Sequence, residues 1–138
     1  MERNRWILAA TTLLALLMLL PASRPAGAAD DPSIKGDVRT QTQAAMNGFI
    51  EAQTVGGVVR LYDPVEGKLL ELKFDKLHSG IVRKGDFYVS CADFVDDSGR
   101  KIDVDFLVIP DDSGKLRATQ AIVHSVDGDK RKYHLESK

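Results

Sequence analysis

The sequence predicts an α+β fold in which one N-terminal helix packs on a curved antiparallel meander sheet of five or six strands. One stretch shows the apolar spacing of an amphipathic helix, and it precedes every stretch with strand-like alternation. The strand-like stretches then follow one another without a second helix. Turn sequences rich in Gly, Pro and Asp separate them, so neighbouring strands are expected to run antiparallel.

The helical pattern covers residues 34–53. Ile34, Val38 and Phe49 fall on one face at helical spacing, while charged side chains fall on the other. We expect Gly56-Gly57 to end the helix, because glycine readily adopts the left-handed conformation found after helix C-termini.

The runs after the helix alternate apolar with polar residues or are rich in β-branched and aromatic side chains. Pro110 ends one of them, because proline cannot donate to a sheet ladder. The path of residues 78–85, which hold two glycines, is not predicted. The expected strands are residues 58–62, 69–77, 87–95, 102–109, 116–126 and 130–136.

Turn chemistry predicts the register of the later strands. Residues 96–100 and 111–115 share Asp-Asp-Ser-Gly followed by a basic residue, which indicates a type I turn with a glycine bulge. Asp127-Gly128 indicates a two-residue hairpin. Counting outward from these turns places Val104 opposite Ile122. The face expected to receive the helix then carries Tyr88, Phe94, Ile102, Val104, Val108, Ala118, Ile122, His124, Arg131 and Tyr133.

On that face His124, Arg131 and Tyr133 are expected to line the polar end of the core or a shallow pocket. They are candidates for contact with a ligand or partner. The predicted register puts His124 and Cys91 on opposite faces, so no Cys–His pair is expected. Because no nucleophile–base pair, nucleotide-binding glycine loop or zinc spacing occurs, we predict neither enzyme activity nor a cofactor.

The opposite face of the sheet, here called the outer face, carries the other candidate binding residues. Asp93 is expected opposite Asp103, and Asp105 opposite Cys91. Like charges directly opposite each other are unfavourable, so a counter-ion is expected. Arg117 or Lys101 can supply it, or a divalent cation can bind the carboxylates.

The outer face also has an apolar half. A half-apolar outer face in a short chain suggests a protein-partner surface or a homodimer interface. The alternative is that the sheet curls and buries this surface. The residues concerned are Phe87, Val89, Leu107, Ile109 and Val123.

Residues 1–29 have the order of a secretory signal peptide. Arg3 and Arg5 precede an apolar core, and small residues follow at residues 25–29. We expect cleavage after this segment and a single domain over residues 30–138, exported to the periplasm or secreted. An uncleaved membrane anchor is the alternative, although the apolar core is shorter than the roughly 20 residues of a spanning helix.

The composition of the mature chain restricts the classes of partner that are expected. Residues 30–138 hold 16 Lys and Arg against 19 Asp and Glu, a net charge of −3. This balance predicts neither nucleic acid nor an anionic membrane as a partner. The single cysteine, Cys91, cannot form an internal disulfide and is expected to be buried.

Gln53-Thr54-Val55-Gly56-Gly57 resembles the Gln-x-Val-x-Gly signature of the cystatins, which inhibit papain-like cysteine proteases. A helix followed by an antiparallel sheet is also similar to the cystatin-like and nuclear-transport-factor-like architectures. The tract from Tyr88 to Val108 resembles small exported bacterial proteins of unassigned function. The resemblance to cystatins would imply protease inhibition through residues 53–57.

We therefore predict an exported, non-enzymatic binding or interaction domain. Its partner would be a protein or small ligand in the cell envelope. Two alternatives remain open: an accessory protein that binds a small ligand or divalent metal through Asp93, Asp103 and Asp105, and a cystatin-type inhibitor.

Overall fold

The computed structural model describes residues 30–132. The expected signal peptide (residues 1–29), Tyr133 and most of the last expected strand lie outside the described residues. Within residues 30–132, no helix is both long enough and apolar enough to span a bilayer.

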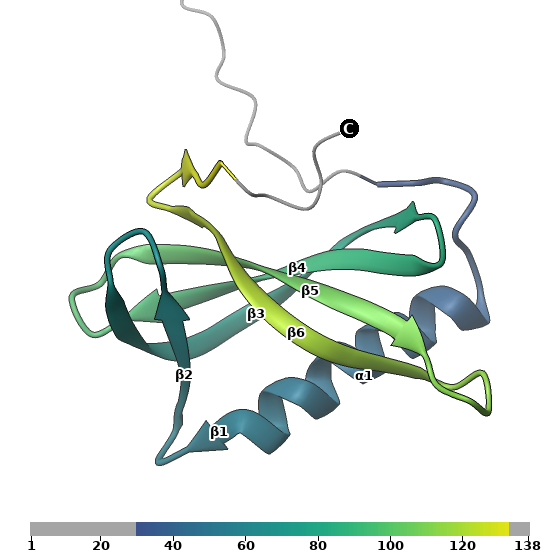
Figure 1. The fold of residues 1–138 in the computed structure, drawn as a ribbon, viewed down its shortest axis with the longest axis horizontal. Helices are drawn as coiled ribbons and strands as arrows, with labels where there is room; N and C mark the ends of the chain where they lie inside the picture. Colours follow the sequence, from purple (N-terminus) through teal and green to yellow (C-terminus); the bar gives the residue numbers. More distant parts are fainter. Residues whose placement is uncertain (1–29, 133–138) are drawn as a thin grey trace, which may run out of the picture.

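The described chain is one helix followed by an antiparallel sheet in which every strand pairs with the next along the sequence (Figure 1). This confirms the α+β meander. The sheet has seven strands rather than five or six, because Thr54–Val55 forms an additional short strand at one edge. The elements are α1 (Asp37–Gln53), β1 (Thr54–Val55), β2 (Val58–Asp63), β3 (Lys68–Lys84), β4 (Phe87–Asp96), β5 (Lys101–Pro110), β6 (Leu116–Val126) and β7 (Asp129–Lys130).

The helix α1 begins later than expected, at Asp37 instead of Ile34, and ends at Gln53 as expected. The segment before α1 binds the sheet instead of joining the helix, because the Asp31 amide donates to the Ile81 carbonyl at 2.8 Å. At the other end α1 stops at Gln53, and Gly56-Gly57 forms the turn of the β1–β2 hairpin. Both glycines have positive φ angles of 63° and 82°, as tight hairpin turns require.

The core lies between α1 and the concave face of the sheet. Met46 and Ile50 of α1 are buried against side chains from β2 to β6. Phe106 contacts Phe49 edge to face at 5.7 Å between ring centroids and stacks on Phe94 at 6.4 Å. Burying large aromatic rings in this way supplies much of the packing energy of a small domain.

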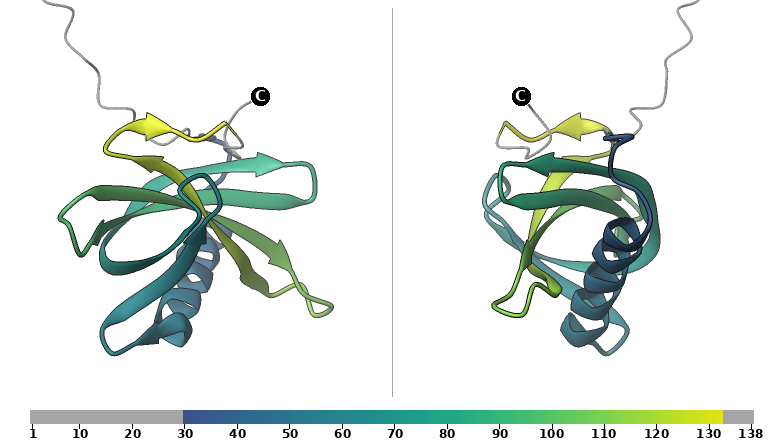
Figure 2. Two further views of the ribbon diagram at one scale, coloured as in Figure 1. Left: turned by 60° about the vertical axis from the view of Figure 1, so that its left-hand side comes forward. Right: turned by 90° about the vertical axis from the view of Figure 1, so that its right-hand side faces the viewer.

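β3 is a 17-residue strand that includes most of the connection whose path was not predicted. Its pairing with β4 shifts twice, between Phe74 and Lys76 and between Leu77 and Ile81. Such bulges bend a strand and increase its twist. The sheet therefore curls around the helix, and β2 comes into contact with β6 (Figure 2).

The predicted register holds between β4 and β5. Between β5 and β6 it holds where Val108 pairs with Ala118, next to the turn, and fails beyond Thr119. Asp93 pairs with Asp103 and Cys91 with Asp105, as expected. Irregularities in the β5–β6 pairing leave Thr119 and His124 without opposite residues, so Val104 pairs with Val123 instead of Ile122. Each bulge reverses which face the following residues occupy.

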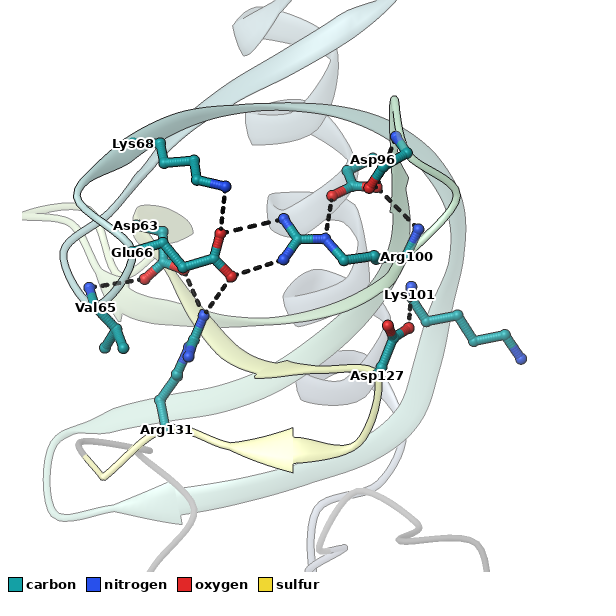
Figure 3. Close-up of polar contacts among 10 residues, drawn as sticks. Asp63, Val65, Glu66, Lys68, Asp96, Arg100, Lys101, Asp127 and Arg131 are labelled. Carbon is teal, nitrogen blue, oxygen red and sulfur yellow. Dashed lines mark hydrogen bonds and ion pairs between the residues drawn. The ribbon is translucent and has the colours of Figure 1, made fainter.

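An ionic network joins the turns at one end of the sheet (Figure 3). Glu66, in the β2–β3 turn, accepts hydrogen bonds from Arg100 at 2.7 Å and from Arg131 at 3.3 Å. Arg100 also bonds Asp96 at 2.7 Å, and Arg131 bonds Asp63 at 2.5 Å. The network therefore connects the β2–β3 turn to the β4–β5 turn and to the segment after β7.

Candidate functional site

Six side chains that can bind a proton or a metal gather on the outer face of the sheet. They come from four neighbouring strands, so the meander places residues far apart in sequence side by side. They are His78 of β3, Cys91 and Asp93 of β4, Asp103 and Asp105 of β5, and His124 of β6.

The inner part of this cluster is Cys91, Asp105 and His124. The thiol of Cys91 donates to Asp105 Oδ1 at 3.1 Å, and His124 Nδ1 lies 2.8 Å from the same oxygen. Cys91 and Asp105 are completely buried and His124 is 2 % exposed. Two donors to one carboxylate oxygen make a compact polar centre inside the domain.

The outer part of the cluster is His78, Asp93 and Asp103. His78 Nε2 lies 2.8 Å from Asp93 Oδ1, and Lys76 Nζ lies 3.5 Å from the other oxygen of Asp93. The side chains of His78 and Asp103 are 18 % and 23 % exposed, so this part of the cluster reaches solvent.

Two buried atoms at the outer part lack a hydrogen-bond partner within the described residues: His78 Nδ1 and Asp103 Oδ1. A buried polar atom without a partner costs about 1–3 kcal/mol. Burial raises the pKa of Asp103 to about 6, although the nearby His124 and His78 oppose this rise. Asp103 is therefore a carboxyl whose charge is poorly compensated by the protein itself.

His124 is on the opposite face from the one predicted. It was expected on the helix side, away from Cys91, yet both side chains bond Asp105. The cause is the bulge at Thr119, which shifts the pairing by one residue, so that Val123 points to the helix and its neighbour His124 points outward. The predicted absence of a Cys–His neighbourhood is therefore wrong.

Other predicted site residues lie elsewhere. The Arg131 backbone donates to the His124 carbonyl at 2.7 Å, but its side chain reaches Asp63 and Glu66. Tyr133 lies outside the described residues. The pocket expected around His124, Arg131 and Tyr133 on the helix side is thus not formed by these side chains in the described part of the chain.

The counter-ions of the carboxylates also differ from those expected. Arg117 pairs with Asp111 at 2.7 Å, and no ion pair within the described residues joins Lys101 to the cluster. Lys76 and His78 face Asp93 instead. Sequence reasoning missed His78, although the following Ser79-Gly80 is the kind of sequence where a bulge redirects a side chain.

The predicted apolar interface on the outer face is reduced. Val89 is fully buried, and Val123 is 2 % exposed in the helix-facing core because the β5–β6 bulges reverse its direction. Phe87 and Leu107 are partly buried. Only Ile109, at 38 %, is substantially exposed.

The donor atoms of the cluster fit a metal ion. A ring nitrogen of His78, the Cys91 sulfur and an Asp103 oxygen lie within 4.8 Å of one another, and the same holds for Cys91, Asp105 and His124. Thiolate, imidazole and carboxylate are the ligands that proteins use for zinc and similar ions.

Comparison of the chain with protein-family models, curated proteins and solved structures finds no match. The function of the cluster therefore has to be inferred from its own geometry.

Proposed function

We propose that this protein is an exported, non-enzymatic binding domain whose ligand is a divalent cation held by the outer-face cluster. The observation that supports this most directly is the convergence of two histidines, one cysteine and two aspartates whose ligand atoms form two overlapping sets, each within 4.8 Å. The signal-like residues 1–29 support delivery to the periplasm or to the outside of the cell.

The electrostatics of the cluster favour a cation. Asp93 and Asp103 face each other directly across β4 and β5. Asp105 is completely buried behind them. Like charges in opposed positions destabilise a sheet, and a bound cation removes that cost. The unpartnered Asp103 Oδ1 offers it a ligand atom.

A binding role suits the cluster better than catalysis by cysteine. Cys91 is fully buried, so its sulfur is not accessible to a substrate in the described structure. Catalytic cysteines are partly exposed in electropositive surroundings. The carboxylates around Cys91 instead make its surroundings electronegative.

Thermal melting of the exported chain tests the proposal. Millimolar calcium, magnesium, manganese or zinc is added in turn, and a chelator is then added to reverse the effect. At least one ion should raise the melting temperature, because a ligand that binds only the folded state stabilises it. Asp103→Asn should weaken this shift, whereas Asp75→Asn, on the exposed part of β3, should not. Equal melting temperatures under all conditions would rule out a cation ligand.

A protein-partner or homodimer surface is a second candidate function, supported by exposed Ile109 beside partly buried Phe87 and Leu107. Light scattering of Ile109→Glu tests it. A dimer that dissociates in this variant, but not in Leu69→Glu at a separate exposed position, supports the surface. A monomeric wild type that captures no envelope protein argues against it.

Inhibition of a cysteine protease is a third candidate. Gln53-Thr54-Val55-Gly56-Gly57 leads from the end of α1 into an exposed hairpin turn, and Val55 is 64 % exposed. This placement supports the cystatin-like shape more than the nuclear-transport-factor-like one, since the cystatin signature occupies a hairpin tip. Papain activity that is unchanged by a large excess of the protein would eliminate this candidate.

A further inference from the structure

We infer that the cation is a transition metal of the zinc class, bound by the Cys91 thiolate together with His78 and Asp103. This inference rests on the proposed function and names the ligands and the ion class of that same site. The carboxylates alone suggest a hard cation such as calcium, whereas the sulfur and the imidazole change the expected chemistry.

The three ligands are close to the spacing that one ion needs. Ligand atoms of a tetrahedral zinc centre bound at about 2.0–2.3 Å lie roughly 3.5 Å apart. The His78, Cys91 and Asp103 atoms lie within 4.8 Å of one another. Because the three residues come from adjacent strands β3, β4 and β5, small side-chain rotations suffice to bring them onto a common ion.

His78 is oriented as metal-binding histidines usually are. Its Nε2 is hydrogen-bonded to Asp93, and its buried Nδ1 has no partner within the described residues. A carboxylate on one ring nitrogen fixes the tautomer and makes the other nitrogen a better ligand. Asp93 therefore acts as a positioning residue that leaves Nδ1 for the ion.

Asp105 and His124 support the sulfur ligand from inside the domain. Asp105 accepts the hydrogen bond of the Cys91 thiol and also contacts His124. On coordination a metal–sulfur bond replaces the S–H bond, and the thiol proton passes to the surrounding buffer. Asp105 loses the thiol hydrogen bond in this step, while His124 Nδ1 remains against the same carboxylate oxygen, and neither residue binds the metal.

Three protein ligands leave one position of a tetrahedral ion unfilled. His78 and Asp103 are the partly exposed ligands, while Cys91 is fully buried. The remaining position therefore faces solvent, where water or a donor group of a partner can occupy it. Such an open position distinguishes this centre from closed, four-residue structural zinc sites.

Cobalt(II), which replaces zinc and absorbs light, is the probe for the experiment. The exported chain, reduced and freed of metal, is titrated with cobalt(II) while the ultraviolet and visible spectrum is recorded. We expect a thiolate-to-cobalt charge-transfer band and strong visible bands of four-coordinate cobalt, saturating at one ion per chain. Added zinc should abolish both bands, and calcium or magnesium should not.

Variants assign the ligands. Cys91→Ser should lose the charge-transfer band while it remains folded, since the change is nearly isosteric. His78→Gln and Asp103→Asn should lose the four-coordinate visible spectrum. Asp105→Asn should keep both sets of bands and bind cobalt about 10–100-fold more weakly. Asp75→Asn, at an exposed position of β3, should match the wild type.

The outcomes separate this inference from the proposed function. Cation-dependent melting without a charge-transfer band in the wild type would overturn thiolate ligation and leave a carboxylate site standing. A band that persists in both His78→Gln and Asp103→Asn but disappears in Asp105→Asn would assign the ion to the inner triad instead. No response to any cation would reject the inference and the proposed function together.

Discussion

Among the residues of the polar cluster, Asp103 is the one that most clearly destabilises the folded domain. Burial raises its pKa to about 6, and Asp93 lies directly opposite on β4. Its Oδ1 atom is buried without a hydrogen-bond partner within the described residues. A residue that destabilises the domain and yet offers a ligand atom is typical of a functional site.

Replacing Asp103 with Asn should therefore stabilise the metal-free protein. The folded pKa of about 6 exceeds the ordinary 3.8, so the folded form loses stability as pH rises between these values. At neutral pH the substitution should raise the free energy of unfolding by on the order of 1–2 kcal/mol, and this gain should vanish below the ordinary pKa. Urea unfolding of both proteins, in the presence of a chelator and at several pH values, measures this difference in the free energy of unfolding.

Asp75→Asn is the control, because Asp75 is exposed. A loss of stability in Asp103→Asn at neutral pH would show that Asp103 is a satisfied structural carboxylate. It would also weaken the case for a cation at this position.

Among the elements, two turns with nearly the same sequence differ in burial. In each turn the first Asp accepts backbone hydrogen bonds from the residues two and four positions later, at Asp96 and at Asp111. The Asp96 side chain is 2 % exposed, whereas the Asp111 side chain is 25 % exposed. The same local chemistry thus operates in two environments.

Asp96→Ala should destabilise the protein more than Asp111→Ala. Removing Asp96 leaves Arg100 Nε and two turn amides without their acceptor in a largely buried setting, at a cost of about 2–3 kcal/mol. Asp111→Ala should cost about 1 kcal/mol or less, because the Asp111 side chain is partly exposed and water can replace its hydrogen bonds. Chemical unfolding measures the free energy of unfolding of both variants. Equal losses of stability would contradict this prediction.

The β4–β5 turn should also respond to acid. Hydrogen bonds from Arg100 and Lys68 lower the pKa of Glu66 to about 2. Burial opposes the ionisation of Asp96, but its hydrogen bonds from Ser98 and Arg100 outweigh that effect, and its pKa is also about 2. Both folded pKa values lie below the ordinary ones, so the stability they contribute is lost as pH falls from the ordinary values toward about 2.

Arg100→Met should remove much of this acid sensitivity. The variant should be less stable at neutral pH, and its melting temperature should fall less than that of the wild type on acidification. Lys73→Met, at an exposed position of β3, is the matched loss of one positive charge. If Arg100→Met and the wild type lose the same stability in acid, the ion pairs of Arg100 do not set these pKa values.

At the scale of the whole molecule, Arg131 joins the last described segment to the first long hairpin. It bonds Asp63, whose side chain is completely buried, and also Glu66 in the same turn (Figure 3). The sheet curls enough for β2 to contact β6, so this pair connects elements that lie far apart in the strand order. Neither partner is close to the other in sequence.

Arg131→Met should therefore be among the more damaging charge removals in the chain. It leaves the buried Asp63 carboxylate without its cation, and breaking a buried pair in this way costs about 3–5 kcal/mol. Arg117→Met removes an exposed ion pair and should cost less than about 1 kcal/mol. Similar unfolding free energies for the two variants would show that Arg131 does not hold the curled sheet together.

Only part of the candidate site could be predicted from the sequence. The turn at residues 96–100 correctly predicted that Asp93 faces Asp103 and that Cys91 faces Asp105. The positions of His78 and His124 could not be predicted, because bulges in β3 and β6 direct both side chains. A bulge is stabilised by the curvature of the whole sheet, which no short stretch of sequence reveals.

The sequence by itself determined the helix, the long strands and the hairpins, because apolar periodicity and turn chemistry act over a few neighbouring residues. The tertiary structure alone decided that His78 and His124 join Cys91 and the aspartates, and that Arg131 reaches Asp63 instead of that cluster. The physical reason is that curling the sheet around α1 shifts the strand pairing. Each shift exchanges the residues on the helix face with those on the outer face.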